Sequence, residues 1–392
     1  MPWTSSKIHR DETPLPAPHP PLKVLYLCVG LNGLGGTANH LRTLLGKIDP
    51  DCIEATLVIG TKIPDVLKTY FRDTPARIII DGRYKRCGYL PFIGSLAALC
   101  RQKRFDLVHS FFIQSDVIAA LLAAGGLFRS RISTFEGRLI TSVTPWKIGL
   151  LNVLNRLIRK GFDCNVFISQ YLLKTYGPRH GLTGKRACVI YPGIDASWFK
   201  DAPPPREHPE TFRVGFVGRW SPEKGSSIFL DAAVFMTHRL LPIRLFILGA
   251  ARSDPRLQTE IRRRGLETAV AIRPWEEDLR PALKELDIVV IPSLEEGLSY
   301  VAIEALSQKR AVIASDVGGL PEVVRSGRTG KLIPPGDPAA LAAAVEECLR
   351  EWGSARRLGE EGFVDCRERF EAGREASEIA QLYENVLKSA AV

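Results

Sequence analysis

The chain has 392 residues, more than one hydrophobic core usually serves, because cores stop growing at roughly 250 to 300 residues. Hydrophobic residues make up 45% and charged residues 24%, a balance that excludes a disordered chain and predicts two globular domains. The net charge of +10 favours an anionic partner, but no nucleic-acid-binding motif accompanies it, so we expect no nucleic-acid partner.

A flexible leader is expected at residues 1–21, which mix prolines with polar groups and lack the apolar core of a signal peptide. No apolar stretch reaches the ~18 residues that a membrane-spanning helix needs. The eight cysteines show no C-x-x-C pair, which favours reduced thiols, and the seven histidines are too scattered to predict a metal cluster. We therefore expect a cytoplasmic protein, either soluble or peripheral on a membrane.

In the first half, short strands rich in Val, Ile and Leu alternate with amphipathic helical stretches. This rhythm is typical of a parallel sheet that is covered on both faces. The expected strands are Lys23–Val29, Glu54–Ile59, Arg77–Ile80, Asp106–His109, Ile132–Thr134, Cys164–Ile168 and Ala187–Ile190. We place a first doubly wound α/β domain at residues 22–199.

A glycine-rich stretch, GLNGLGGTANHL at residues 30–41, follows the first expected strand. From Gly33 it satisfies the form G-x-G-x-x-A of a dinucleotide-binding loop, but the second strand ends in TLVIGTK, without the acidic residue that such a site needs. An ordinary turn at a strand-to-helix corner is one alternative. The other is a loop in which Gly35 and Gly36 expose amide groups at the start of a helix near Thr37, where a phosphate or sugar oxygen can bind.

Three successive prolines within KDAPPPREHPET predict an interdomain linker at residues 200–211. The alternating pattern restarts with FRVGFVG and continues through IRLFILG, VAIR, DIVVIPS and AVIAS. This predicts a second doubly wound domain at residues 212–370, with its ligand at the carboxyl ends of the strands. Asp337 and Pro338 suit the start of a long helical stretch, and we expect the last helix, at 371–392, to pack back toward the first domain.

Two cations lie in FVGRWSPEKG, residues 216–225, where the first strand of the second domain leads into a helix. Arg219 and Lys224 at the carboxyl edge of a parallel sheet would suit a diphosphate. Taken alone, each could equally be a solvated surface charge.

A pair of glutamates lies further on, in PSLEEGLSYVAIEAL. Glu296 falls in the loop after an expected strand, and Ser299 is a plausible N-cap, which would leave the amides of Leu298 and Ser299 near a helix start for a phosphate. Glu304 projects from the second turn of that helix, and carboxylates accept hydrogen bonds from pairs of sugar hydroxyls.

The spacing of these two glutamates resembles the E-x7-E signature of the retaining glycosyltransferases of the GT-B fold, and of glycosyltransferase family 4 in particular. Other segments resemble the family in the same order: GLGGTANHL, FDLVHSF, VIYPGID, GRWSPEKG, DVGGLPEVV and GKLIPPGD. The resemblance covers roughly residues 22–388. It implies two Rossmann-like domains facing a cleft.

The resemblance also implies a role for each site residue. Arg219 and Lys224 would hold the donor diphosphate, Glu304 the ribose and Glu296 the transferred sugar. Leu298 and Ser299 would contact phosphate and sugar through their amides, and Gly35 and Gly36 would let the first domain's loop close on the donor. The activity implied is transfer, with retention, from a nucleotide diphosphate sugar to a glycan or lipid-linked acceptor in cell-surface polysaccharide or glycolipid synthesis. A nucleotide-sugar epimerase and a non-catalytic nucleotide-sugar-binding protein are the alternatives.

Two positions depart from the family pattern. Glu136 stands where many members carry a histidine after the fifth strand, and Phe111 stands where a second histidine is common. Glu136 could take over a sugar contact or pair with Arg138. Leu298 and Ser299 replace a common Phe-Gly pair, which is tolerable because backbone groups act there.

The resemblance also implies that the reaction needs no metal or other cofactor, because cations and a helix start would supply the positive charge at the diphosphate. The sequence contains one D-x-D, Asp49–Asp51, which reads as a turn. Basic residues of the first half could bind an anionic membrane surface, although they could also be solvated faces of ordinary helices. They are Arg83, Lys85, Arg86, Arg101, Lys103, Arg104, Arg156, Arg159 and Lys160.

Overall fold

The computed structural model describes residues 20–31, 33–82, 88–137, 153, 156–182, 184–251, 253–274 and 276–390. The chain divides into two compact units. The first unit is Met1–Phe167, Leu173–Ile190 and Ala376–Val392, and the second is Ile168–Leu172 and Tyr191–Glu375. The predicted leader at 1–21 lies almost entirely outside the described residues.

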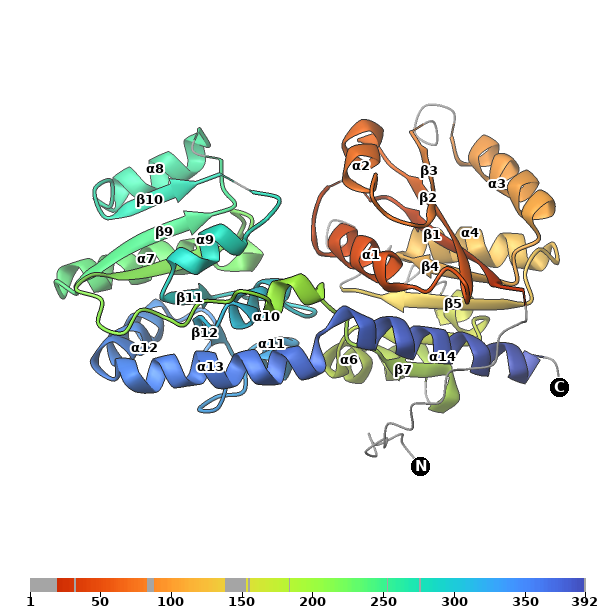
Figure 1. The fold of residues 1–392 in the computed structure, drawn as a ribbon. Coiled ribbons are helices and arrows are strands. Elements are labelled where there is room, and N and C mark those ends of the chain that lie inside the picture. The colour runs from red at the N-terminus through yellow and green to blue at the C-terminus, as the bar shows by residue number, and fades with distance from the viewer. Residues whose placement is uncertain are drawn as a thin grey trace. The chain divides into compact units, whose positions relative to one another are not determined.

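The first unit is built on a seven-stranded sheet with the order β3-β2-β1-β4-β5-β6-β7 (Figure 1). Every neighbouring pair is parallel. All seven predicted strands are present, with ends within two residues of the prediction, because each is an apolar run between turns. They are β1 (Leu22–Val29), β2 (Ile53–Gly60), β3 (Arg77–Asp81), β4 (Leu107–Phe111), β5 (Ser130–Phe135), β6 (Cys164–Phe167) and β7 (Ala187–Val189).

Alternate residues of β1 supply two cores, one on each face of this sheet. Tyr26 and its face pack with α1 (Gly36–Lys47), α2 (Pro64–Tyr70) and α14 (Ala372–Ala390). Leu27 and the opposite face pack with α3 (Tyr89–Lys103) and α4 (Ile113–Ala124). A strand buried on both faces explains why β1 reads as a continuous apolar run in the sequence.

The last helix, α14, joins the first unit through a buried polar contact as well as through apolar packing. The hydroxyl of Tyr383 lies 2.6 Å from Nδ1 of His109 and donates to the hydroxyl of Tyr26 over 2.9 Å. Nε2 of His109 lies 2.6 Å from the hydroxyl of Thr134. Burial lowers the pKa of His109 to about 3, so the ring stays neutral at physiological pH.

The second unit is built on a six-stranded parallel sheet with the order β10-β9-β8-β11-β12-β13. Five of its strands match predicted runs: β8 (Phe212–Val217), β9 (Ile243–Leu248), β10 (Val270–Arg273), β11 (Ile288–Ile291) and β12 (Ala311–Ser315). The sixth, β13 (Lys331–Ile333), was not predicted as a strand, because three residues, of which only Ile333 is buried, are too few to show a periodicity. The prediction of two doubly wound parallel-sheet domains is confirmed.

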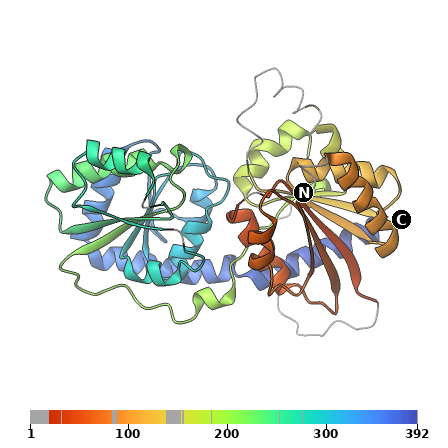
Figure 2. The same cartoon turned by 90° about the horizontal axis from the view of Figure 1, so that it is seen from above.

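Helices cover both faces of the second sheet (Figure 2). One face packs against α7 (Ser226–His238), α8 (Pro255–Arg263) and α12 (Pro338–Arg350). The other elements are α9 (Arg280–Glu285), α10 (Tyr300–Ser307), α11 (Leu320–Val323) and α13 (Trp352–Arg369). Asp337 caps α12 by accepting from the amide of Ala340 over 2.9 Å, and Pro338 opens that helix, as predicted.

The proline-rich stretch at 200–211 is fastened to the second unit at several points. The buried guanidinium of Arg310 donates to the carbonyl of Pro203 over 2.6 Å, and Arg206 forms an ion pair with Asp287. The indole of Trp352 donates to the carbonyl of Arg206 over 2.8 Å. Among the described residues, no helix combines the length and apolar character that crossing a bilayer requires.

Candidate functional site

The loop after β8 brings Lys224 to Glu296, which follows β11. Nζ of Lys224 lies 2.7 Å from Oε2 and 3.0 Å from Oε1 of the Glu296 carboxylate. The two side chains are 26% and 8% exposed, so solvent screens this pair less than an ordinary surface ion pair. The contact between Lys224 and Glu296 follows from the strand order, because β8 and β11 are neighbours and the loops after them leave the same edge of the sheet.

Arg219, in the same loop, remains largely in solvent. Its side chain is 76% exposed and reaches Glu223 at 3.4 Å, a weak surface pair. It is therefore available to an anion that enters at this edge. Lys224 is held by a nearly buried carboxylate, whereas Arg219 has only this weak pair with Glu223.

Backbone contacts lock the two loops together. The amide of Leu294 donates to the carbonyl of Glu223 over 2.9 Å. Gly225 has φ +72°, and a Cβ at that position would lie 1.8 Å from the carbonyl oxygen of Pro292. Only glycine fits there, and the close approach sets the distance between the Lys224 and Glu296 backbones.

The segment after β12 closes on the same loop from the other side. A Cβ at Gly318, where φ is +61°, would lie 1.9 Å from the carbonyl oxygen of Glu296, and one at Gly319 would lie 2.2 Å from that of Gly297. The Gly319 amide donates to the Glu296 carbonyl over 3.1 Å. The two glycines therefore hold the backbone of Glu296 in place.

The loop ends at the start of α10, where Ser299 is the N-cap. Its hydroxyl accepts from the amide of Ala302 over 3.3 Å, which confirms the predicted cap. The side chain of Leu298 is buried. The amides at a helix start lack intrahelical acceptors, and the helix dipole favours an anion near them.

Glu304 lies on the second turn of α10 and is buried. Burial, with a smaller repulsion from Asp278, raises the pKa of its carboxyl to about 8. Among the described residues no cation forms an ion pair with it. At neutral pH the carboxyl is therefore mostly protonated before any ligand arrives, and it can donate one hydrogen bond while accepting others.

Gly35 and Gly36 lie in the first unit, where Gly35 is the N-cap of α1 and Gly36 is its first residue. Both are exposed, and a Cβ at Gly35 would meet nothing within 4 Å. The predicted helix start near Thr37 is thus confirmed to within one residue. The N-cap residue makes no side-chain hydrogen bond here, and the first amides of a helix lack intrahelical acceptors.

Glu136, which directly follows β5, binds the first turn of α1. Its carboxylate accepts a hydrogen bond from the hydroxyl of Thr37, and its Oε1 lies 2.5 Å from Nδ1 of His40. Both Glu136 and His40 are nearly buried. Arg138, the partner considered from sequence, lies outside the described residues.

Sequence reasoning did not select His40 as a functional candidate. It lies three residues after Thr37, which places both side chains on one face of α1. Phe111 is buried and stacks on His109, with ring centroids 4.8 Å apart. The imidazole nearest Glu136 therefore comes from a helix rather than from a strand end.

Glu322, within the segment DVGGLPEVV, is a second residue that the sequence did not single out. Its carboxylate accepts from the amides of Gln170 and Tyr171, the first residues of α6 (Gln170–His180), over 2.8 and 2.6 Å. It also accepts from the hydroxyl of Tyr191 over 2.7 Å. Glu322 thus caps a helix through a long-range contact, and a pattern of neighbouring residues could not reveal it.

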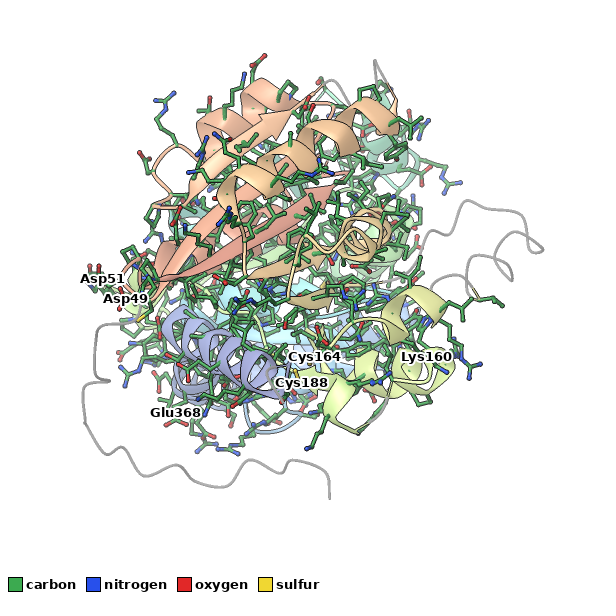
Figure 3. All side chains as sticks on the ribbon, turned by 90° about the vertical axis from the view of Figure 1, so that its right-hand side faces the viewer. Asp49, Asp51, Lys160, Cys164, Cys188 and Glu368 are labelled. Carbon is green, nitrogen blue, oxygen red and sulfur yellow. The ribbon has the colours of Figure 1, made fainter. Side chains whose placement is uncertain are left out.

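The Asp49–Asp51 segment has the geometry of a turn. The Asp51 amide donates to Oδ1 of Asp49 over 3.0 Å, and both side chains lie at the surface (Figure 3). Within the described ranges, no three His, Cys, Asp or Glu side chains gather as a metal site would require. Figure 3 also shows Cys164 beside Cys188, with 3.6 Å between two free thiol sulfurs.

Of the basic residues considered for a membrane face, Arg159 is unavailable, which corrects the sequence-based grouping. It is 1% exposed and forms an ion pair of 2.7 Å with the buried Asp116. Arg101, Arg104, Arg156 and Lys160 are exposed. Arg83, Lys85 and Arg86 lie outside the described residues.

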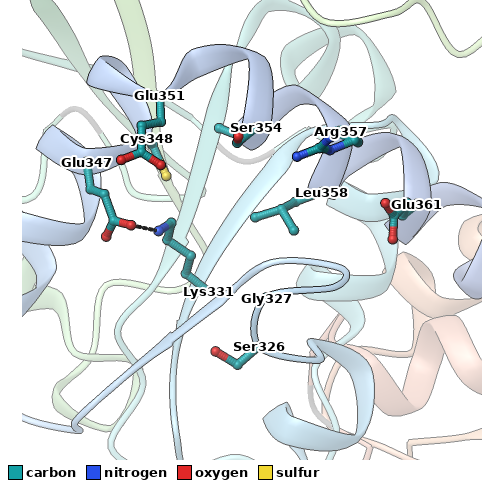
Figure 4. A pocket seen from close by; sticks show the side chains of 11 residues that line it. Ser326, Gly327, Lys331, Glu347, Cys348, Glu351, Ser354, Arg357, Leu358 and Glu361 are labelled. Atoms are coloured by element: carbon teal, nitrogen blue, oxygen red, sulfur yellow. Dashed lines mark ion pairs between the residues drawn. The ribbon is translucent and has the colours of Figure 1, made fainter.

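A cavity of about 410 Å³ lies in the second unit between β13 and the helices α12 and α13. Lys331 and Glu347 form an ion pair across it (Figure 4). None of the predicted site residues lines this cavity. It lies at the start of β13, whereas the predicted residues follow the ends of their strands.

Comparison with known families identifies the chain. Residues 34–198 match the family described as Glycosyltransferase Family 4, and residues 211–351 match the family described as Glycosyl transferases group 1. The chain belongs to glycosyltransferase family 4. The family resemblance expected from the sequence motifs is therefore confirmed.

This family 4 chain is 32% identical over 239 residues to the alpha-maltose-1-phosphate synthase of Mycolicibacterium smegmatis, a match over 55% of this chain and 60% of that protein. It is 29% identical over 175 residues to the alpha-D-kanosaminyltransferase of Streptomyces kanamyceticus, over 44% of this chain and 45% of that one. The matches thus span about half the length of the curated relatives.

The fold of this family 4 chain is shared by solved GT-B structures. HepE from Anabaena, crystallised with UDP and glucose, superposes with a TM-score of 0.77 over 93% of this chain and 99% of that one. The sequence identity of 19% means that this likeness shows the fold alone. Within that fold, the Lys224–Glu296 pair follows two central strands of the second sheet.

Proposed function

We propose that this protein transfers a sugar from a nucleotide diphosphate sugar to a hydroxyl group of a glycan or lipid-linked acceptor, with retention at the sugar. The observation that carries the proposal is the Lys224–Glu296 pair beside the helix start at Ser299. A cation, a carboxylate and a helix start at one sheet edge can bind phosphate and sugar together. The UDP and glucose held by HepE support the choice of donor class.

In this proposal the diphosphate binds Arg219, Lys224 and the first amides of α10. Both oxygens of Glu296 already accept hydrogen bonds from the ammonium of Lys224, and each has a further lone pair for a sugar hydroxyl. Glu304 holds the ribose hydroxyls through a carboxyl that can both donate and accept. Gly35 and Gly36, at the start of α1, stay predicted donor contacts through their amides.

The reaction breaks the bond between the anomeric carbon and the phosphate oxygen and forms one to the acceptor oxygen on the same face of the sugar. The acceptor proton passes to the leaving phosphate oxygen, so no protein nucleophile is needed. The protein's task is to stabilise the negative charge that grows on the diphosphate. Fixed cations and helix amides do this because they need no reorganisation at the moment of reaction.

We place this activity in polysaccharide or glycolipid synthesis, in the cytoplasm and peripherally on its membrane. The exposed Arg101, Arg104, Arg156 and Lys160 support attraction to an anionic surface. Flotation with anionic vesicles at low salt tests the membrane step, and absence of binding there rules it out.

The full chain should be incubated with a panel of nucleotide diphosphate sugars, with and without oligosaccharide and polyprenyl-phosphate acceptors. We expect release of the nucleoside diphosphate that depends on the acceptor. A product formed without any acceptor would indicate an epimerase instead, and donor binding without turnover would indicate a binding protein.

We further expect transfer to be metal-independent, because Arg219, Lys224 and the helix start supply the positive charge. Activity should persist after treatment with EDTA and dialysis. Loss of activity with EDTA and recovery with Mg²⁺ or Mn²⁺ would show that a metal shares this task.

A further inference from the structure

Three arginines lie on one face of three neighbouring strands in the second unit. Arg213 of β8 is in register with Arg244 of β9, and Phe246 of β9 is in register with Ala271 of β10. Side chains two residues apart on a strand share a face, so Arg273 joins them on that face. The opposite face of the same strands is the apolar core that contains Val214 and Ile247.

Charged residues at these positions break the usual rule for a parallel sheet. Strands of such sheets are normally apolar on both faces because helices cover both. Here Arg244 is exposed, whereas Arg213 and Arg273 are half-buried. Together with Phe246, Ala271, Ile272 and Glu285 they line a cavity of about 280 Å³.

The charges in this cavity do not balance. Arg273 forms an ion pair of 2.6 Å with Glu285, whose pKa is lowered first by that hydrogen bond and then by the charges of Arg273 and Arg213. Arg213 reaches only the backbone carbonyl of Glu285, at 3.4 Å. Glu276 acts on Arg273 only by longer-range attraction. One lining carboxylate thus faces three guanidinium groups.

Arg244 forms no ion pair with any described residue. Its guanidinium lies 5.6 Å from the centroid of the Phe246 ring, and that of Arg273 lies 5.2 Å from the same ring. Aromatic contacts of this kind orient a guanidinium and leave its N–H groups for an acceptor. The cavity therefore presents oriented donors, and its positive charge exceeds the one negative charge that Glu285 supplies among the described lining residues.

We propose that this cavity binds the phosphate group of a phosphorylated ligand. Arginine forks match the spacing of phosphate oxygens and bind them by paired, charge-assisted hydrogen bonds. Arg213 and Arg244 stand at the beginnings of β8 and β9, and Arg273 stands at the end of β10. The residues that line the cavity include none of Arg219, Lys224, Glu296 and Glu304. The cavity is thus separate from the proposed donor site, and a ligand there can bind together with the nucleotide sugar.

The test measures the melting temperature of the full chain in sodium phosphate and in sodium chloride of equal ionic strength. We expect phosphate to raise it more, because a ligand that binds only the folded state stabilises that state. Arg244→Gln should weaken phosphate binding about tenfold, or about 1.4 kcal/mol. Arg256→Gln, an exposed arginine at the start of α8 outside the cavity, is the matched control.

Lys224→Met separates this cavity from the proposed donor site. The part of the phosphate effect that depends on Arg244 should persist in Lys224→Met. Equal phosphate effects in Arg244→Gln and Arg256→Gln, or an equal effect of chloride in the parent chain, would overturn the proposal. The proposed function can fail without affecting this outcome.

A soluble phosphate monoester and a lipid headgroup could both supply the phosphate. Glucose 6-phosphate in the melting assay probes the first source, and vesicles of phosphatidic acid in phosphatidylcholine probe the second. A response to either that is lost in Arg244→Gln supports the proposal and identifies the source. The proposal is contradicted if inorganic phosphate, the ester and the vesicles all fail to give a response that depends on Arg244.

Discussion

Glu296 and Glu304 illustrate how two carboxyl groups on one short segment can be prepared for different tasks. Glu296 faces the ammonium of Lys224, whereas Glu304 is buried without a cation among the described residues, and its pKa rises to about 8. A protonated carboxyl offers a donor and an acceptor, and a paired carboxylate offers acceptors alone. Surroundings rather than residue type make this difference.

Glu304→Gln should change how the stability of the free protein depends on pH. The folded-state pKa is raised above the unfolded value, so the folded state holds a proton that the unfolded state loses, and stability falls as pH rises from about 4.5 to about 8. This group can contribute a slope of up to about 1.4 kcal/mol per pH unit. Urea unfolding across that range should show a flatter profile for Glu304→Gln, and identical profiles would contradict the assigned protonation.

Lys224→Ala and Arg219→Ala should each lower turnover strongly, because each removes positive charge from the leaving diphosphate. By analogy with the loss of one oxyanion-hole donor, we expect a cost of about 2.7–4 kcal/mol in the barrier. Steady-state kinetics with the donor found in the screen measure this effect. Arg239→Ala, a surface arginine paired with Glu346, is the control. Near-normal transfer by either variant would remove that residue from the proposed mechanism.

At the scale of elements, the loops after β8, β11 and β12 act as one rigid body because glycines let their backbones touch. Gly225 meets Pro292, and Gly318 meets Glu296, at distances that no side chain could tolerate. The charges of Lys224 and Glu296 are therefore positioned by backbone geometry rather than by side-chain packing. Rigid support of this kind keeps a site in its working geometry.

Gly318→Ala tests this support. The new Cβ would collide with the Glu296 carbonyl and move the loop, so we expect a lower melting temperature and weaker nucleotide binding. Gly327→Ala is a matched control, since Gly327 also has a positive φ, +75°, but open space around it. Gly318→Ala should cost about 1–3 kcal/mol more than the control in urea unfolding. Equal costs would show that the contact does not constrain the loop.

The positions of strands were predictable from the sequence wherever a continuous run of apolar residues is buried, as in β1 and β11. The short β13 was missed because it has three residues and only the last of them, Ile333, is buried. The role of each catalytic candidate came from motif resemblance, but the Lys224–Glu296 contact joins residues 72 positions apart. Knowing that β8 and β11 are neighbours would have been enough to predict it. The contact of Glu136 with His40 could not be predicted, because it depends on where two side chains lie, and the separation of residues in the sequence does not specify that.

At the scale of the whole molecule, the two ends of the described chain meet in one core. Tyr383 of α14 contacts Tyr26 of β1, 357 positions away, and both belong to the core that α1 and α2 share. The first unit therefore consists of three separate stretches of sequence. Its stability depends on a helix encoded after the entire second unit.

Tyr383→Phe should destabilise the first unit. It removes a buried hydroxyl and leaves Nδ1 of His109 and the Tyr26 hydroxyl without this partner, so we expect a loss of about 1–3 kcal/mol. Ser389→Ala, on the exposed face of the same helix, is the control and should change stability by less than about 0.5 kcal/mol. Urea unfolding distinguishes them, and equal stabilities would show that the hydroxyl contributes nothing.

The same helix determines when the core of the first unit can be completed during synthesis of the chain. Residues 1–190 leave the ribosome long before residues 376–390, yet Ala376, Ile379 and Tyr383 complete their core. All residues of the second unit, Ile168–Leu172 and Tyr191–Glu375, precede residues 376–390, so the second unit can complete its core before the first unit does. Until residues 376–390 have been made, the part of this core that α14 covers lies open to solvent, and exposed apolar surface of this kind is what chaperones bind.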